Sequence, residues 1–336
     1  MLTSITVPEM TDLITRSVDM EMENAISYPL MNSGLFRRVD IADGTGNTRR
    51  FADFDVDKFA RRKTQGNDVE DMQVQYGYEK DVVVETVGFQ LTIDLETRLQ
   101  DKSGMVPSTV RSLAASVPNR MELDMEHRLG FGFATSYQNL EGETVNTTVS
   151  DGLALFSSVH TLAGSATTYS NIVTGNPQLS EASLALAENV ISQNRITHLG
   201  QKMPKSTGKK FIILTDDRTQ YNLAKKIVYS GSSVLETNSG VMNPFQSEYE
   251  IIQLPYMATN AEGVSDSTKL KYWGIFYADA FNAVYAVQRM AEVYPPSSGS
   301  NGEDATTRNW VWVVIGMYGI ATLTGRGCAF SKGDGT

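Results

Sequence analysis

The feature that most constrains this sequence is an alternating strand, residues 82–95, preceded by a long, charged, extended stretch at 50–81. A strand that alternates apolar and polar side chains has one face to bury. The stretch 51–78 offers no helix and no compact core of its own to cover that face. We therefore expect a long two-stranded projection that lies on a neighbouring copy of the chain, and a role in assembly.

The size of the chain predicts more than one structural unit. Its 336 residues exceed the roughly 250–300 at which single hydrophobic cores stop growing, so we expect two subdomains around one scaffold. The single cysteine, Cys328, cannot form an intrachain disulfide, and the N-terminus lacks a basic and apolar signal segment. These features favour synthesis and folding in a reducing cytoplasm.

Charge and hydropathy exclude some classes of function. Lys and Arg total 29 against 39 Asp and Glu, a formal net charge of -10. Sequence-specific DNA binders usually concentrate positive charge, so specific recognition is not expected, although an acidic wall remains compatible with enclosing nucleic acid. The longest apolar run, residues 310–321, is shorter than the roughly 20 residues of a membrane helix, so we expect a buried strand and no membrane partner.

The first strand of the expected projection has two distinct sides. Asp53, Asp55 and Asp57 fall on one side, whereas Phe54 and Val56 fall on the other. This alternation is typical of a half-buried strand, and we expect the apolar side to pack against a neighbouring copy of the chain.

Beyond this strand lies a charged tip with a basic group followed by an acidic group: Lys58, Arg61, Arg62 and Lys63, then Asp68, Glu70 and Asp71. One interpretation is a solvated loop, because exposed ion pairs are each worth about 0–1 kcal/mol. The other is complementary docking of the basic group of one copy on the acidic group of the next, which would set register more than strength.

Helical patterns lie on both sides of the projection. We expect a short helix at 6–22 and a long one from Pro107 to about Ser136, with Pro118 as a kink or junction. Its apolar stripe follows i+4 spacing: Val117, Met121, Met125, Leu129 and Phe133.

The later part of the chain predicts an α/β region. We expect a helix at 179–195, a strand at 209–214, and a helix at 218–229 that Asp216 or Asp217 caps. Further strands are expected at 249–254, 272–277 and 283–290, and a flexible loop at 295–302 before the final strand.

Sequence patterns for catalysis and cofactor binding are weak. A phosphate-binding loop fails because Met203 occupies the first glycine position. The three aspartates of residues 53–57 lack the glycine and glutamate of a calcium loop, and the three histidines are far apart, so we expect no metal and no cofactor. Asp151, Ser157 and His160 have the residue types of a hydrolytic triad but lie too close together, so structural hydrogen bonds are expected.

One motif resembles a known family. The segment Asp151-Gly152-Leu153-Ala154-Leu155-Phe156-Ser157-Ser158-Val159-His160 resembles the Asp-Gly-x-x-Leu-Phe-x-x-x-His stretch of tailed-phage major capsid proteins, particularly Mu-like head subunits. The strand at 310–321 is a second likeness. The order of arm, long helix and later α/β region resembles the Hong Kong 97 capsid fold over nearly the whole chain.

The resemblance implies an α+β fold and a set of domains. These would be an N-terminal arm at 1–38, an extended β-hairpin loop at 39–86, a peripheral domain with a spine helix at 87–150, a connecting segment at 151–176, an axial domain at 177–290, and a return to the peripheral domain at 291–336. Because arm-like sequence follows Met1 almost directly, we expect a separate scaffolding protein.

The leading hypothesis is a non-enzymatic shell protein of the virion. Copies of the chain would form pentamers and hexamers around double-stranded DNA, with scaffolding, portal and decoration proteins as further partners. The residues expected at inter-subunit contacts are Phe51, Phe54, Val56, Lys58, Arg61, Arg62, Lys63, Asp68, Glu70 and Asp71.

Two alternatives stay open at this stage. One is an encapsulin-like nanocompartment shell, which would hold a protein cargo in place of DNA. The other is a cytoplasmic α/β hydrolase in which Asp216 or Asp217 acts as acid or base at a strand's carboxyl end. Helix capping explains both aspartates more simply.

Overall fold

The computed structural model describes residues 34–66, 68–94, 96–97, 105–232, 242–294 and 309–335, without the side chains of 105–108, 110 and 111. The helix expected at 6–22, most of the N-terminal arm and the loop expected at 295–302 lie outside the described residues.

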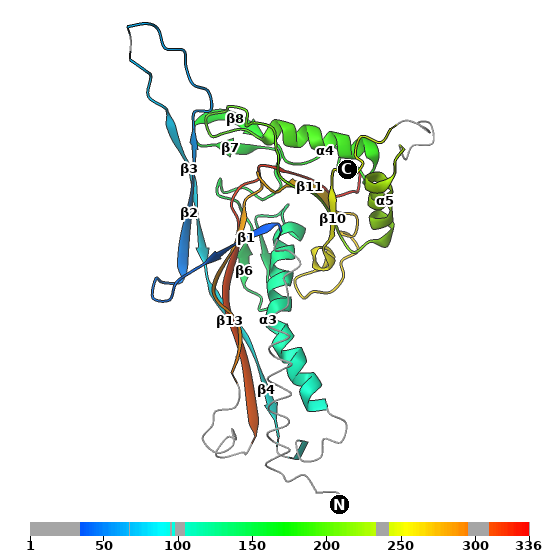
Figure 1. Cartoon of the computed structure of the whole chain (residues 1–336). Coiled ribbons are helices and arrows are strands. Elements are labelled where there is room, and N and C mark those ends of the chain that lie inside the picture. Colours follow the sequence, from blue (N-terminus) through cyan, green and yellow to red (C-terminus); the bar gives the residue numbers. More distant parts are fainter. Residues whose placement is uncertain are drawn as a thin grey trace, which may run out of the picture.

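The structure contains the expected two-stranded projection. Strand β2 (Thr48–Val56) pairs antiparallel with β3 (Val74–Val83), and the segment between them forms the free tip at the upper left of Figure 1. The extended chain then continues through Val84 into β4 (Glu85–Ile93). The continuous segment 74–93 therefore contributes one strand to the hairpin and one strand to the sheet that contains β13.

The expectation that a neighbour must cover the strand at 82–95 is wrong, since even Val82 and Val84 at its start are buried within the same chain. Strand β4 pairs antiparallel with β13 (Trp310–Thr322), and Ile93 is buried in the main core with Val87 and Leu91 packed against that core. The covering elements are far away in the sequence, which is why the segment preceding the strand gave no sign of them.

The first sheet has the strand order β1-β12-β13-β4 and forms the lower stem of the molecule with helix α3 (Figure 1). Strand β1 (Phe36–Asp40) runs parallel to β12 (Ala283–Tyr294), and β12 runs antiparallel to β13. We had placed residues 283–290 in the axial range, but they pair within this sheet. The boundaries between domains stay a prediction.

The long helix α3 (Met105–Gly130) buries the expected stripe, since Val117, Met121, Met125 and Leu129 are almost fully buried. The expected end at Ser136 is wrong. The helix stops at Gly130, where a Cβ atom would lie 2.4 Å from the carbonyl oxygen of Met257, so the backbones approach too closely for another residue. Pro118 lies inside the helix rather than at a junction.

The turn after α3 leads into a small hairpin, β5 (Ser136–Gln138) with β6 (Thr144–Asn146). A second small hairpin, β7 (His160–Leu162) with β8 (Ser165–Tyr169), lies beside the upper part of the projection in Figure 1. The short 3-10 helix η2 (Pro255–Ala258) packs against α3.

The second sheet has the order β10-β9-β11-β14: Glu250–Gln253, Lys210–Leu214, Trp273–Tyr277 and Cys328–Ser331. Helices α4 (Glu181–Asn194) and α5 (Arg218–Tyr229) pack on it, and Asp217 caps α5 by accepting from the Thr219 N–H. The predicted helices and cap are confirmed. No helix among the described residues combines the length and apolar character needed to span a bilayer.

Candidate inter-subunit surface on the hairpin

The β2–β3 hairpin is held to the body by its acidic face. The Asp55 carboxylate accepts hydrogen bonds from the His198 backbone N–H (2.6 Å) and from Nη1 of Arg326 (3.0 Å). Asp55 and Arg326 are 8% and 5% exposed. A buried charge pair with such partners resists separation, because removing one member leaves an uncompensated charge.

Asp53 binds the same part of the body. The Nδ1 atom of His198 accepts from the Ala163 backbone N–H (3.3 Å), which places the imidazole proton on Nε2, and Nε2 then donates to Asp53 (3.2 Å). Burial would raise the pKa of Asp53, but the hydrogen bond from His198 and the charge of Arg326 outweigh burial and hold this pKa below its ordinary value. Asp53 is therefore a carboxylate at neutral pH.

The contact continues toward the tip. Gln201 donates through Nε2 to Asp57 (2.7 Å) and accepts through Oε1 from the Lys58 backbone N–H (2.9 Å). On the paired strand, a Cβ atom on Gly77 would lie 2.3 Å from Nε2 of His198, so only glycine fits this approach. The lower half of the hairpin is thus fixed by polar and steric contacts along its length.

Asp53, Asp55 and His198 have ligand atoms within 4.8 Å of one another, a spacing that could suit a metal ion. The Arg326 guanidinium lies 3.0 Å from Asp55 and 3.8 Å from Asp53. The chain therefore supplies its own cation here, and the residues do not fit a metal site.

The opposite face of the hairpin carries Phe54 near the tip and points away from the body of the chain. Phe54 is 64% exposed while Asp55 is buried, so the acidic side faces the body and the apolar side faces away. The predicted alternation is confirmed, and the packing of its apolar side against a neighbouring copy stays a prediction. Arg326 and His198 are distant in sequence and make the acidic side the one with partners.

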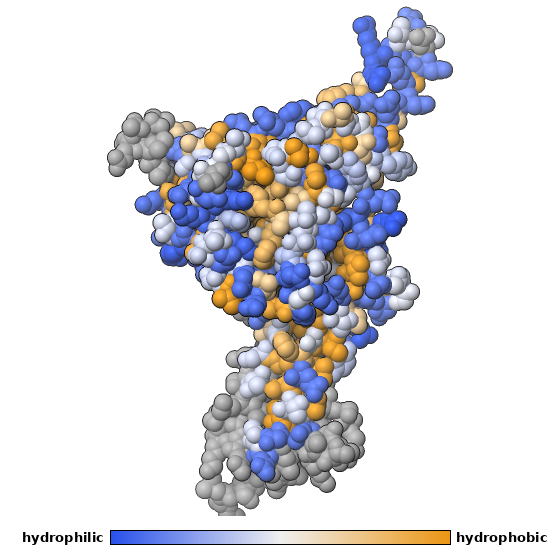
Figure 2. All heavy atoms as spheres, turned by 180° about the vertical axis from the view of Figure 1, so that it is seen from behind, coloured by the Kyte–Doolittle hydropathy of each residue, from blue (hydrophilic) through white to orange (hydrophobic). Residues whose placement is uncertain are grey.

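The outward apolar surface extends from the strands into the tip. Phe54 lies opposite Tyr76, which is 75% exposed. We call the following side chains the outer patch: Phe54, Phe59, Val69, Met72, Val74 and Tyr76. Figure 2 shows the predominantly hydrophilic tip above the rest of the molecule, and the patch places apolar side chains among these polar ones. Each patch member is more than half exposed.

Some of the predicted contact residues are partly buried, and the others are exposed. Phe51 packs partly into a small cluster with Val39 and Met317, and Val56 is partly exposed. The charged residues of the tip are all exposed. Arg61 pairs with Glu70 of the same chain (3.1 Å) and lies 4.0 Å from Asp57, so one ion pair that we considered between copies forms within a copy.

Sequence reasoning missed His198, Gln201 and Arg326, which hold the hairpin. Each lies in a loop, and no pattern links it to the aspartates, from which Arg326 is 271 residues away. The one indication in the sequence that this strand needs polar partners is the alternating group Asp53, Asp55 and Asp57.

The segment 151–160 forms structural hydrogen bonds, as expected. Nδ1 of His160 lies 2.7 Å from Asp151 and Nε2 lies 3.2 Å from the Leu155 carbonyl oxygen, so neither nitrogen meets a serine hydroxyl. The Ser157 hydroxyl instead accepts from the Val159 N–H. These residues do not assemble a triad.

No family model matches this sequence, and no curated protein matches it either. Solved structures do. The capsid of Ralstonia phage GP4 is 13% identical with a TM-score of 0.54, over 88% of this chain and 86% of that one. The mature capsid of bacteriophage PhiM1 is 11% identical with a TM-score of 0.51, over 90% and 87%.

A structure of Gordonia phage Cozz is similar at the same level, 15% identical with a TM-score of 0.51 over 90% of this chain and 85% of that one. At such low identity these likenesses establish the fold. The chain has the α+β, Hong Kong 97-like fold of phage capsid subunits, which confirms the fold class that the sequence motifs implied.

Proposed function

We propose that this chain is the structural subunit of an icosahedral phage head, assembled from pentamers and hexamers around double-stranded DNA. One observation carries the proposal: a chain with the fold of capsid subunits projects a hairpin whose inner face is held and whose outer patch is left exposed by the described part of the chain. Covering an apolar side chain of this size is worth about 1.5–3 kcal/mol. A second copy can supply that cover.

The two faces make the hairpin suitable as a connector. Its held base fixes the direction in which the tip points, so little conformational entropy is lost when the tip meets a neighbour. Specific interfaces typically bury about 1,200–2,000 Å², more than one hairpin supplies, so we propose that each copy contacts several others. Many moderate contacts would then replace one strong contact.

The remaining partners follow from the proposed role. Scaffolding, portal and decoration proteins would act on the same shell, in a virion whose subunits are made in the host cytoplasm. The net charge of -10 suits an enclosure that does not bind the packaged DNA sequence-specifically. We propose no catalytic role, and the hydrolase alternative is not favoured because the Asp217 carboxylate already caps α5.

Imaging of the purified full chain tests this function. Size-exclusion chromatography with negative-stain microscopy should show rings or shells of megadalton size. A discrete monomer or small oligomer under all assembly conditions, with scaffolding protein supplied, would contradict the proposal.

Charge reversal at the tip tests the contribution of the basic group. Because Arg61 has a partner in its own chain, Arg62→Glu is the cleaner change. We expect soluble, folded subunits with a lower particle yield in micrographs, because a repulsive charge enters the interface. Arg37→Glu, a change to an exposed cation on β1 that forms no ion pair among the described residues, is the control. Equal particle yields for both variants would show that the basic group of the tip does not contribute to the interface.

A further inference from the structure

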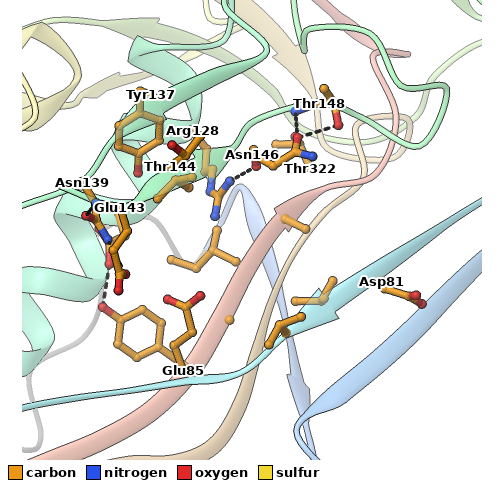
Figure 3. A pocket seen from close by; sticks show the side chains of 18 of the residues that line it. Asp81, Glu85, Arg128, Tyr137, Asn139, Glu143, Thr144, Asn146, Thr148 and Thr322 are labelled. Atoms are coloured by element: carbon orange, nitrogen blue, oxygen red, sulfur yellow. Dashed lines mark hydrogen bonds between the residues drawn. The ribbon is translucent and has the colours of Figure 1, made fainter. Parts of the chain in front are cut away.

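A polar cavity of about 300 Å³ lies away from the outer patch, enclosed by the β3–β4 junction, helix α3, strand β13 and the β5–β6 hairpin (Figure 3). Its walls include three basic side chains, Lys80, Arg120 and Arg128. Arg120 is fully engaged, since it binds Asp124 (3.0 Å) and Glu141 (2.8 Å). The other two cations have a different environment.

Lys80 and Arg128 have no carboxylate within ion-pair distance among the residues that the structure describes. Nζ of Lys80 donates to the carbonyl oxygen (2.9 Å) and the hydroxyl (3.0 Å) of Thr148. Nη1 of Arg128 donates to the Asn146 carbonyl oxygen, while its Nε is buried without a partner. Both cations therefore keep unused capacity to donate hydrogen bonds.

The two cations also disfavour each other. Burial lowers the pKa of Lys80, and the nearby positive charge of Arg128 lowers it further. Like charges in a partly desolvated cavity are unfavourable unless an anion lies between or beside them. Burial raises the pKa of Asp124 and the charge of Arg128 is close enough to lower it in part, but no described carboxylate forms an ion pair with either cation.

Three of the four carboxylates that line the cavity, all except Glu85, have hydrogen-bond or ion-pair partners within the described chain. Asp124 binds Arg120 and the Tyr318 hydroxyl, and Asp81 binds Arg50 and lies on the far side of β3 in Figure 3. Glu143 accepts from the Asn139 amide (3.3 Å). Glu85 enters the cavity from the side opposite Arg128 (Figure 3).

We propose that this cavity binds a small oxyanion, a carboxylate or a phosphate group, between Lys80 and Arg128. The guanidinium of Arg128 and the ammonium of Lys80 can each donate a charge-assisted hydrogen bond to an oxygen of such a group. Glu85, across the cavity, weakens the site by repulsion. The anion is either a free ion or a carboxylate side chain of a second copy, and only this second source rests on the proposed function.

Calorimetric titration of inorganic phosphate into the full, unassembled chain tests the site, in buffer whose chloride keeps the ionic strength constant. Lys80→Met should weaken phosphate binding roughly tenfold or more, because one charge-assisted hydrogen bond is lost. Glu85→Gln should tighten it several-fold, because the opposing charge is removed. Arg62→Gln, a change to an exposed cation on the tip, should leave it unchanged.

The Glu85→Gln variant keeps the test decisive if Lys80→Met fails to fold, because Glu85 is an exposed residue on an edge strand. No phosphate binding to the wild type, or equal binding by wild type and Glu85→Gln, overturns the proposal. Repeating the titration on assembled particles separates the two sources. Binding lost on assembly identifies a carboxylate of a second copy, whereas binding retained identifies a free anion.

Discussion

The inward face of the β2–β3 hairpin presents Asp53 and Asp55 to Arg326 and His198, whereas the described residues leave Phe54 and Tyr76 on the outward face largely exposed. Both faces belong to the same few residues. The polar face is buried and the apolar face is exposed, the reverse of what is usual for a strand on a hydrophobic core. The inner face therefore sets the position of the hairpin, and the outer face is available to another molecule.

Arg326→Met should give the largest effect, because it leaves Asp55 buried without its cation. We expect a loss of about 3–5 kcal/mol in the free energy of unfolding, measured by urea denaturation of the unassembled chain. The double variant Asp55→Asn with Arg326→Met should recover much of this loss, since the buried charge is gone. If Arg326→Met costs no more than Arg62→Met on the tip, the inner face does not hold the hairpin.

Acid should destabilise the body and the hairpin anchor over different pH ranges. Burial, with the charge of Lys269 adding to it, lowers the pKa of His127 to about 4, whereas an unfolded histidine titrates near 6.5. Between these values the unfolded chain binds a proton that the folded chain refuses, so stability falls as the pH falls from about 6.5 to 4, by about 3 kcal/mol in total.

The contribution of Asp53 in the hairpin anchor is also lost as the pH falls, but over a lower pH range. The folded pKa of Asp53 lies below its ordinary value of 3.8, so its contribution is complete above that value and is lost only at lower pH. Hydrogen exchange at pH 4.5–6 should show that the free energy of global unfolding declines. The free energy of local opening at the hairpin amides should not decline over the same range. His127→Gln should flatten the decline; an unchanged slope in that variant would assign the acid sensitivity to other groups.

Gly77→Ala tests how tightly the hairpin approaches the body. The added methyl would meet the His198 ring at 2.3 Å, so we expect a loss of about 1–3 kcal/mol in unfolding free energy. Gly231→Ala is the matched control, because nothing lies within 4 Å of its added Cβ, and its effect should stay within about 0.5 kcal/mol. Equal effects of the two changes would mean that the hairpin can shift without cost.

Local patterns in the sequence predicted much of this fold. The stripe of α3, the capped helix α5 and the buried strand β13 follow from spacing and from short-range hydrogen bonds such as that of Asp217. The end of α3 did not follow, because Gly130 meets the remote backbone of Met257.

The two faces of the hairpin strand were predicted, but the residues of the body that cover the acidic face were not. Phe54 and the charged tip lie on the projecting hairpin, yet the choice of buried face depends on Arg326 and His198, which are 271 and 143 residues away from Asp55. Alternation alone assigns two faces without saying which one has partners. Burial of an acidic face was the outcome that hydropathy could not suggest.

The double variant Phe54→Ser with Tyr76→Ser tests the central contrast most directly, by particle yield in micrographs together with urea denaturation of the unassembled chain. Because both side chains are exposed on the outer patch, we expect stability within about 0.5 kcal/mol of wild type and a strong loss of assembled particles. Particles at wild-type yield, or a subunit that is itself destabilised, would contradict the account.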